Sequence, residues 1–259
     1  MTPVLTLTGL TKRFGAVIAN DAVDLTLHQG EVLALLGENG AGKTTLMNML
    51  FGHYVPDAGT VQVADASATL RTLPPGQPQT ALKRGIGMVH QHFTLAENLS
   101  ALDNILLGAE PFFALSRKRR AARDKIAGIM ERTGLIAPLD EPVGSLSVGE
   151  RQRVEILKAL YRDARILVLD EPTAVLTPQE ADGLFASIRT MTADGLSVIF
   201  ISHKMREVLA FSDRIAVLRL GRKVGEMATA DADQSSIARL MVGAETEATT
   251  RPTATPGAP

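Results

Sequence analysis

The fold of this chain is decided by the stretch Gly37-Glu38-Asn39-Gly40-Ala41-Gly42-Lys43-Thr44-Thr45. The stretch follows the pattern G-x-x-x-x-G-K-T, which is typical of a phosphate-binding loop. The apolar run Val32–Leu36 precedes it, and helix-forming residues with an apolar stripe follow it over Thr45–Phe51. A strand, a glycine-rich turn and a helix in this order are the context that the motif requires. The motif alone leaves open a glycine-rich turn before an ordinary helix.

Each residue type in this loop has a physical role toward a nucleotide phosphate. The glycines let the backbone fold tightly with its N–H groups pointing inward, and the helix start adds a partial positive charge. Lys43 brings a full charge to the β- and γ-phosphates, and the Thr44 hydroxyl is placed to ligate Mg²⁺. The loop therefore predicts binding of ATP with Mg²⁺.

Composition limits the classes of protein to which the chain belongs. It has 259 residues, a formal net charge of −1 and no cysteine, which excludes disulfides and thiolate chemistry. A charge near zero argues against nucleic acid as a partner. The N-terminus alternates like a strand and lacks the pattern of a signal peptide, and no apolar run approaches the ~18 residues of a membrane span. We expect any membrane association to occur by docking.

Polar side chains follow three apolar runs that are predicted to be strands. Gln91 comes after the first run, Asp170 and Glu171 end the second, and His203 comes after the third. Sheets of α/β proteins bind ligands at the carboxyl ends of their strands. Asp170 suits Mg²⁺, Glu171 suits orienting a water as general base, Gln91 suits a metal or water contact, and His203 can touch a γ-phosphate. Solvated acids at a strand end are the alternative for the carboxylates.

Other features allow more than one interpretation. Phe14 lies in a predicted turn, Thr11–Gly15, and either stacks on a base or fills the core. His90 and His92 suggest a metal, but no further ligand stands near them at metal-binding spacing. The basic run Arg117–Arg120 suits either a solvated helix face or an acidic surface such as lipid headgroups.

The middle and the end of the chain differ in character. Glu97–Gly134 has helical periodicity, with Ala122, Ile126 and Ile129 on one face, and predicts a helical subdomain. Ser147 is a predicted helix N-cap, and Thr177-Pro178-Gln179-Glu180 predicts a capping box. Residues 244–259 contain five Thr, three Pro and no Leu, Ile, Val, Phe or Met, which predicts a disordered tail or linker.

Six features follow one another along the chain: Phe14, the phosphate loop, Gln91, the Leu146–Gln152 segment, Asp170-Glu171 and His203. In this order they resemble the nucleotide-binding domain of ABC transporters. The resemblance covers about residues 4–243, and Leu-Ser-x-Gly after a phosphate loop is highly specific for these ATPases. It implies an α/β fold: a P-loop NTPase core with a mainly parallel sheet, an N-terminal antiparallel β subdomain and an α-helical subdomain inserted at roughly 92–148. We predict one ABC ATPase domain over 1–243.

The resemblance also implies a head-to-tail dimer with ATP between the subunits. One subunit supplies Phe14, the loop Gly37, Glu38, Asn39, Gly40, Ala41, Gly42, Lys43, Thr44 and Thr45, and the groups Gln91, Asp170, Glu171 and His203. In this set Thr44, Gln91 and Asp170 hold Mg²⁺, while Glu171, His203 and Gln91 serve hydrolysis. The other subunit supplies Ser147 and Gly149 against the γ-phosphate.

Within the family, three segments resemble importers of simple sugars and nucleosides: Leu146–Gln152, Asp170–Thr177 and Ile201–Lys204. Those ATPases usually carry two ABC domains in one polypeptide, whereas this chain shows one. Val148, Glu150 and Thr177 also depart from the usual signature glycine, glutamine and D-loop aspartate. The departure at Thr177 puts communication across the dimer in doubt.

The expected function is an ATPase that powers import of a nucleoside or simple sugar from the cytoplasmic face of the inner membrane. Its expected partners are a second ABC domain (tandem or separate), integral membrane permease subunits and an extracytoplasmic substrate-binding protein. A soluble ABC ATPase acting on ribosomes or DNA, and an exporter ATPase, are the alternatives. The tail could tether a second domain or be a plain terminus.

Overall fold

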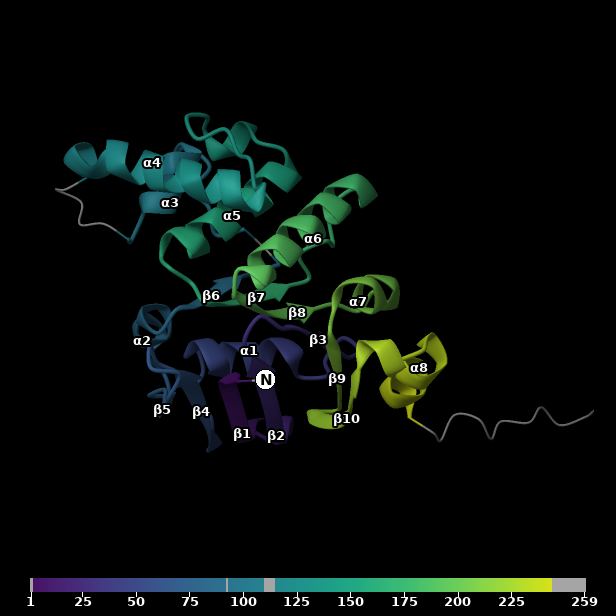
Figure 1. The fold of residues 1–259 in the computed structure, drawn as a ribbon. Helices are drawn as coiled ribbons and strands as arrows, with labels where there is room; N and C mark the ends of the chain where they lie inside the picture. The colour runs from purple at the N-terminus through teal and green to yellow at the C-terminus, as the bar shows by residue number, and fades with distance from the viewer. Residues whose placement is uncertain (1, 92, 110–114, 244–259) are drawn as a thin grey trace, which may run out of the picture.

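The computed structural model describes residues 2–91, 93–109 and 115–243, which form two β-sheets with helices between and around them (Figure 1). The strands are β1 (Pro3–Phe14), β2 (Val17–His28), β3 (Val32–Leu36), β4 (Ala58–Ala64), β5 (Leu70–Thr72), β6 (Ile86–Val89), β7 (Ile166–Asp170), β8 (Ser197–Ile201), β9 (Arg214–Arg219) and β10 (Arg222–Ala228). The helices are α1 (Lys43–Phe51), α2 (Pro78–Lys83), α3 (Ala101–Leu106), α4 (Leu115–Thr133), α5 (Val148–Tyr161), α6 (Pro178–Ala193), α7 (Met205–Phe211) and α8 (Gln234–Val242). Two short 3-10 turns are η2 (Val143–Ser145) and η3 (Thr229–Asp231).

The larger sheet has the strand order β10-β9-β3-β8-β7-β6, and every pair in it is parallel except β10 with β9. Its inner strands β3, β7 and β8 are buried along their whole length. Alternate residues enter two different cores, as Leu33 and Leu35 do on one face and Ala34 and Leu36 on the other. A sheet covered on both faces needs such continuous apolar runs.

The smaller sheet is antiparallel, with the order β2-β1-β4-β5, and α1 lies between it and the larger sheet (Figure 1). The buried side chains Leu46, Met47 and Leu50 of α1 pack in one core with Leu7 of β1 and Leu35 of β3. The expected α/β fold with an antiparallel N-terminal sheet is confirmed.

The other face of the larger sheet is covered by α5, α6 and α7, and α4 packs against α5 and α6. Ile126 and Ile129 of α4 are buried, as their helical spacing predicted. Within the range 92–148 the described residues form α3, α4 and η2; the boundary of a separate subdomain stays a prediction. The proposed tail, 244–259, lies outside the described residues.

The predicted turn at Thr11–Gly15 is wrong for most of its length, because β1 continues to Phe14. Phe14 pairs with Val17 of β2, and the reversal occurs at Gly15, whose φ of 59° is in the left-handed region. Elements β5 and α2, with three and six residues, were not predicted. Both are too short for a periodic pattern to show.

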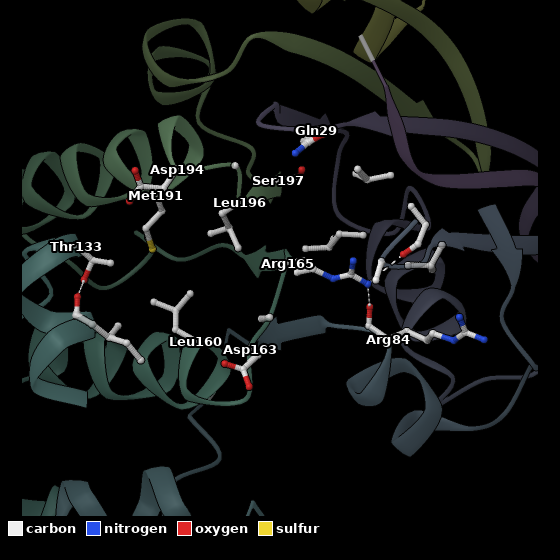
Figure 2. A pocket seen from close by; sticks show the side chains of 18 of the residues that line it. Gln29, Arg84, Thr133, Leu160, Asp163, Arg165, Met191, Asp194, Leu196 and Ser197 are labelled. Carbon is white, nitrogen blue, oxygen red and sulfur yellow. Dashed lines mark hydrogen bonds between the residues drawn. The ribbon is translucent and has the colours of Figure 1, made fainter. Parts of the chain in front are cut away.

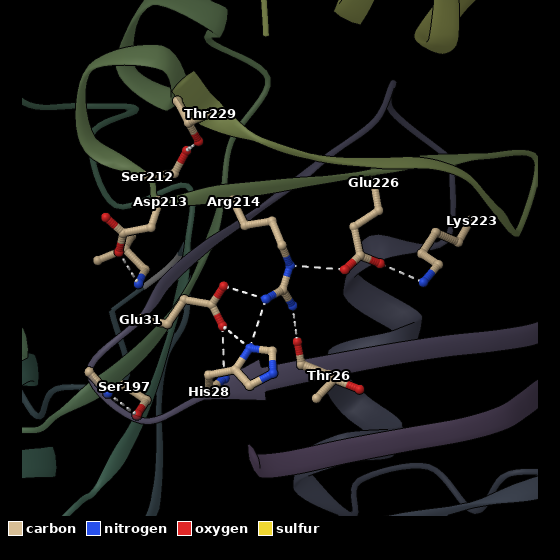
Figure 3. A network of polar contacts seen from close by, with 12 residues as sticks. Thr26, His28, Glu31, Ser197, Ser212, Asp213, Arg214, Lys223, Glu226 and Thr229 are labelled. Atoms are coloured by element: carbon tan, nitrogen blue, oxygen red, sulfur yellow. Dashed lines mark hydrogen bonds and ion pairs between the residues drawn. The ribbon is translucent and has the colours of Figure 1, made fainter. Parts of the chain in front are cut away.

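A network of hydrogen bonds and ion pairs connects neighbouring segments at the edge of the larger sheet where β3 and β9 begin (Figure 3). The guanidinium of Arg214 donates to Glu31 at 2.5 Å and pairs with Glu226 of β10 at 2.9 Å, and it also reaches the carbonyl of Thr26. Glu31 also accepts from the backbone N–H of His28 at 2.7 Å. These contacts join β2, β9 and β10, at the sheet edge opposite the phosphate loop.

Candidate nucleotide-binding site

Strand register brings the predicted site residues to one edge of the larger sheet. Leu35 of β3 lies opposite Ile201 of β8, and Ile201 lies opposite Asp170 of β7. Leu169 in turn lies opposite Val89 of β6. Neighbouring strands are about 4.8 Å apart, so the segments that follow these strands lie side by side. The phosphate loop begins at this edge, and the same edge carries His203, Glu171 and Gln91.

The phosphate loop can be formed only with glycine at two of its positions. A Cβ on Gly37 would lie 2.4 Å from the carbonyl oxygen of Leu218, and one on Gly42 would lie 2.3 Å from that of Ala19. Gly42 also has a φ of 99°. The buried amide of Asn20 donates to the Gly42 carbonyl at 3.2 Å and was not predicted; its chain position carries no motif. The loop is therefore held in one tight conformation.

The start of α1 leaves its backbone N–H groups without a side-chain cap. Side chains cap α5, α6 and α8, whereas α1 begins at Gly42, which has none. Lys43 is 7% exposed and donates to the carbonyls of Gly37 at 2.6 Å and Glu38 at 3.0 Å. Burial lowers the pKa of Lys43, and the nearby carboxylates Glu171 and Asp170 oppose that shift. Uncapped N–H groups beside a buried ammonium suit an anion such as a phosphate.

Asp170 is buried beside another carboxylate. Burial raises the pKa of Asp170, repulsion from Glu171 raises it further, and Lys43 opposes both. A divalent cation would offset the repulsion between the two carboxylates. The exposed Thr44 hydroxyl supplies another oxygen of the kind that Mg²⁺ prefers. No group of three His, Asp or Glu residues suited to a metal occurs in the described part of the chain. The residues fit a Mg²⁺ ion that takes its remaining ligands from phosphate and water.

Glu171 and His203 form a pair across the ends of β7 and β8. The His203 Nδ1 and the Glu171 Oε1 are 2.9 Å apart, which sets Nδ1 as the donor and leaves Nε2 for another partner. The Glu171 side chain is 14% exposed and that of His203 is 51% exposed. Glu171 has a φ of 46°, a strained value for a residue with a side chain. The pair can place a base and a hydrogen-bonding group before a phosphate.

Among the described residues, the remaining predicted ones form no hydrogen bond or ion pair with this pair, and most are exposed or paired with other side chains. Gln91 is exposed just after β6, and His90 stacks on His53 with ring centres 6.0 Å apart. His92 lies outside the described residues. Phe14 is 46% exposed and meets the ring of Tyr54 edge-on at 5.5 Å, so the alternative that it fills the core is wrong.

The Ser147–Gly149 segment begins α5 as a capping box. The Ser147 side chain accepts from the backbone N–H of Glu150 and donates to its carboxylate at 2.8 Å. Ser147 and Val148 are exposed, and Gly149 lies against Glu180 at the start of α6. Within residues 2–91, 93–109 and 115–243 no hydrogen bond joins this segment to the phosphate loop of the same chain. It faces outward, where another molecule could meet it.

A sizeable cavity lies elsewhere. It has a volume of about 900 Å³ and lies where β7 and β8 begin, at the sheet edge opposite the phosphate loop. Thr133, Leu160 and Leu196 are among its lining residues (Figure 2). None of the predicted site residues lines it. A phosphate loop binds through backbone N–H groups at the surface and needs no deep cavity, so we place the candidate site at the loop.

A phosphate loop between β3 and α1, with carboxylates at the end of β7, a parallel strand separated from β3 by β8, defines the class of nucleotide-binding P-loop domains. The sequence of residues 20–174 matches the ABC transporter family. The match covers more than half of the chain, and the chain belongs to that family.

Curated relatives resemble the chain over nearly its whole length. It is 42% identical to a glucose import ATP-binding protein of Haloferax volcanii, with 94% of this chain and 48% of the relative covered. It is 44% identical to a nucleoside import ATP-binding protein of Lactococcus lactis subsp. cremoris, with 93% and 46% covered. The chain thus spans about half the length of the relatives it matches.

Solved structures share the fold. An ATP-binding cassette of an ABC transporter in its ADP conformation has a TM-score of 0.77 at 26% identity, covering 93% of this chain and 96% of that one. A dimeric cassette bound to ADP and Pi has a TM-score of 0.70 at 25% identity, covering 87% and 98%. None of the helices in the described residues is long and apolar enough to cross a membrane.

Proposed function

We propose that this chain binds ATP with Mg²⁺ and hydrolyses it to energise import of a simple sugar or nucleoside through a separate permease. The observation that carries the proposal is the gathering of Lys43, Asp170, Glu171 and His203 at the edge where the phosphate loop begins. The names of the relatives support the substrate class, since they are import proteins for glucose and nucleoside.

The proposed binding roles follow from the positions of the side chains. The N–H groups of the phosphate loop and the Lys43 ammonium hold the β- and γ-phosphates. Thr44, Asp170 and Gln91 would hold Mg²⁺, which supplies charge neutralisation at the phosphate oxygens. Phe14, exposed at the end of β1, stacks on adenine.

The proposed hydrolytic roles fall to Glu171 and His203. Glu171 orients a water toward the γ-phosphate and accepts its proton, since its side chain is nearly buried at the strand end. His203 donates to Glu171 through Nδ1, which leaves Nε2 for a γ-phosphate oxygen. Catalysis of this kind rests on positioning and charge neutralisation more than on covalent chemistry.

We further propose that a second ABC domain, in tandem or separate, completes the site. Ser147 is exposed, and in the described residues no hydrogen bond joins it to its own phosphate loop, which suits contact with ATP held by another domain. The dimeric cassette with a similar fold supports this arrangement. Permease subunits at the cytoplasmic face of the inner membrane, and an extracytoplasmic binding protein, are the other partners of the proposal.

The first test measures ATP turnover with Glu171→Gln, which keeps the shape of the side chain and removes its basicity. Phosphate release should fall about 10²-fold or more while ATP still binds, because the charge and loop contacts remain. Near-normal turnover in this variant, with its partner domain present, would overturn the assignment of Glu171.

The second test addresses the proposed second ABC domain. Sedimentation and phosphate release, each with and without ATP, should show a largely monomeric chain that hydrolyses ATP slowly. A stable ATP-dependent homodimer with rapid turnover would instead show that the chain is its own partner.

A further inference from the structure

A polar cluster, formed by the buried Thr173 and the partly exposed Lys204 and Glu207, joins the loop after β7 to the start of α7. The Thr173 hydroxyl donates to Glu207 at 2.5 Å, and the Lys204 ammonium donates to the Thr173 carbonyl at 2.9 Å. Lys204 and Glu207 are themselves paired at 3.1 Å. We call these three residues the Thr173 clamp.

The buried member of the clamp is Thr173, and its contacts restrain the loop. Thr173 is 2% exposed, whereas the side chains of Glu207 and Lys204 are 17% and 38% exposed. Hydrogen bonds to charged groups are shorter and stronger than neutral ones, and a buried partner left alone is costly. The loop therefore cannot shift at Thr173 without breaking contacts to both charged side chains.

The clamp adjoins both groups to which we assign hydrolysis. Thr173 is two residues after Glu171, and Lys204 directly follows His203. The backbone of Glu171 is strained at a φ of 46°, with its N–H bonded to the Ile201 carbonyl at 3.0 Å. Its carbonyl accepts from the N–H of Ala174 at 3.1 Å. Strain of this kind persists only where the surroundings fix it.

We infer that Lys204 and Glu207 are positioning residues. Through their contacts with Thr173, they hold the side chains of Glu171 and His203 in place relative to each other. The strained backbone at Glu171 directs its carboxylate toward His203. The clamp prevents that backbone from relaxing. The inference rests on the proposed function of Glu171.

The test compares two variants that keep side-chain volume, with Arg206→Ala as control. Glu207→Gln removes the ion pair with Lys204, and Thr173→Val removes the contacts of the hydroxyl with Glu207 and Lys204. Arg206 is exposed on the same helix and belongs to neither the clamp nor the candidate site. Misplacement of a catalytic group by about 1 Å can cost 10²-fold. Turnover at saturating ATP should fall about tenfold to 100-fold in the clamp variants, with KM within about twofold and the control unchanged.

A second arm separates positioning from loss of structure. In a Glu171→Gln background, Glu207→Gln should lower single-turnover phosphate release no further, because the clamp acts through Glu171. Equal losses in both backgrounds, or turnover like that of the unaltered chain, would overturn the inference. A failure of the unaltered chain with its partner to hydrolyse ATP would overturn the proposed function instead.

Discussion

Gly149→Ala tests whether the starts of α5 and α6 depend on each other. A Cβ at Gly149 would lie 2.4 Å from the Glu180 Oε1, so the carboxylate has to move. The same carboxylate accepts from the backbone N–H and from the hydroxyl of Thr177 through Oε2, both at 2.9 Å. Moving it breaks the two contacts that the Glu180 side chain contributes to the capping box of α6, while the Glu180 N–H still donates to the Thr177 hydroxyl at 3.3 Å.

The size of the effect follows from two opposing contributions. Loss of these two contacts costs up to about 1 kcal/mol, the typical size of a helix-capping contribution. Replacing glycine by alanine in a helix gains up to about 1 kcal/mol, and less in the first turn. Gly149→Ala should thus lower the free energy of unfolding by about 0–1 kcal/mol in the natural background. With Glu180→Ala already present, the same change should raise it by up to about 1 kcal/mol.

The assay is urea unfolding of the four proteins without nucleotide, supported by thermal unfolding, where 1 kcal/mol shifts Tm by about 2–4 °C. Gly183→Ala is the matched control, because a Cβ there has nothing within 4 Å and lies inside α6. It should stabilise both backgrounds equally. The reasoning is refuted if Gly149→Ala has the same effect with and without the Glu180 carboxylate.

Two further predictions concern the nucleotide site. Phe14→Ala should weaken ATP binding by about 1–3 kcal/mol and leave inorganic tripolyphosphate binding unchanged, because only ATP carries a base to stack; equal affinity for ATP in a titration would contradict the stacking role. Asp170→Asn should stabilise the nucleotide-free protein at pH 7, since burial and Glu171 raise the pKa of Asp170 and ionisation costs folding free energy. That gain should shrink as the pH falls through the raised pKa toward the ordinary value of about 3.9, where Asp170 itself takes up a proton. Urea midpoints of both proteins at several pH values measure this gain in stability. A gain that does not depend on pH would contradict the assignment to ionisation of Asp170.

Local patterns in the sequence determined much of this protein. The glycine loop, the apolar runs of β3, β7 and β8, and the acids that end β7 are visible without the fold. Each is encoded in neighbouring residues, because a buried strand needs an unbroken apolar run and a tight phosphate turn needs glycine. The N-cap at Ser147 and the capping box at Thr177 were likewise predicted from the sequence, and the structure adds that the cap at Ser147 is also a capping box.

Only the tertiary structure decided which distant side chains meet. Thr173 reaches Glu207 across 34 residues, and Arg214 reaches Glu31 across 183. The extension of β1 to Phe14, and the approach of Gly149 to Glu180, depend in the same way on strand register and helix packing. No local pattern encodes such contacts, because they exist only after separate elements have packed and their side chains have been brought within hydrogen-bonding distance.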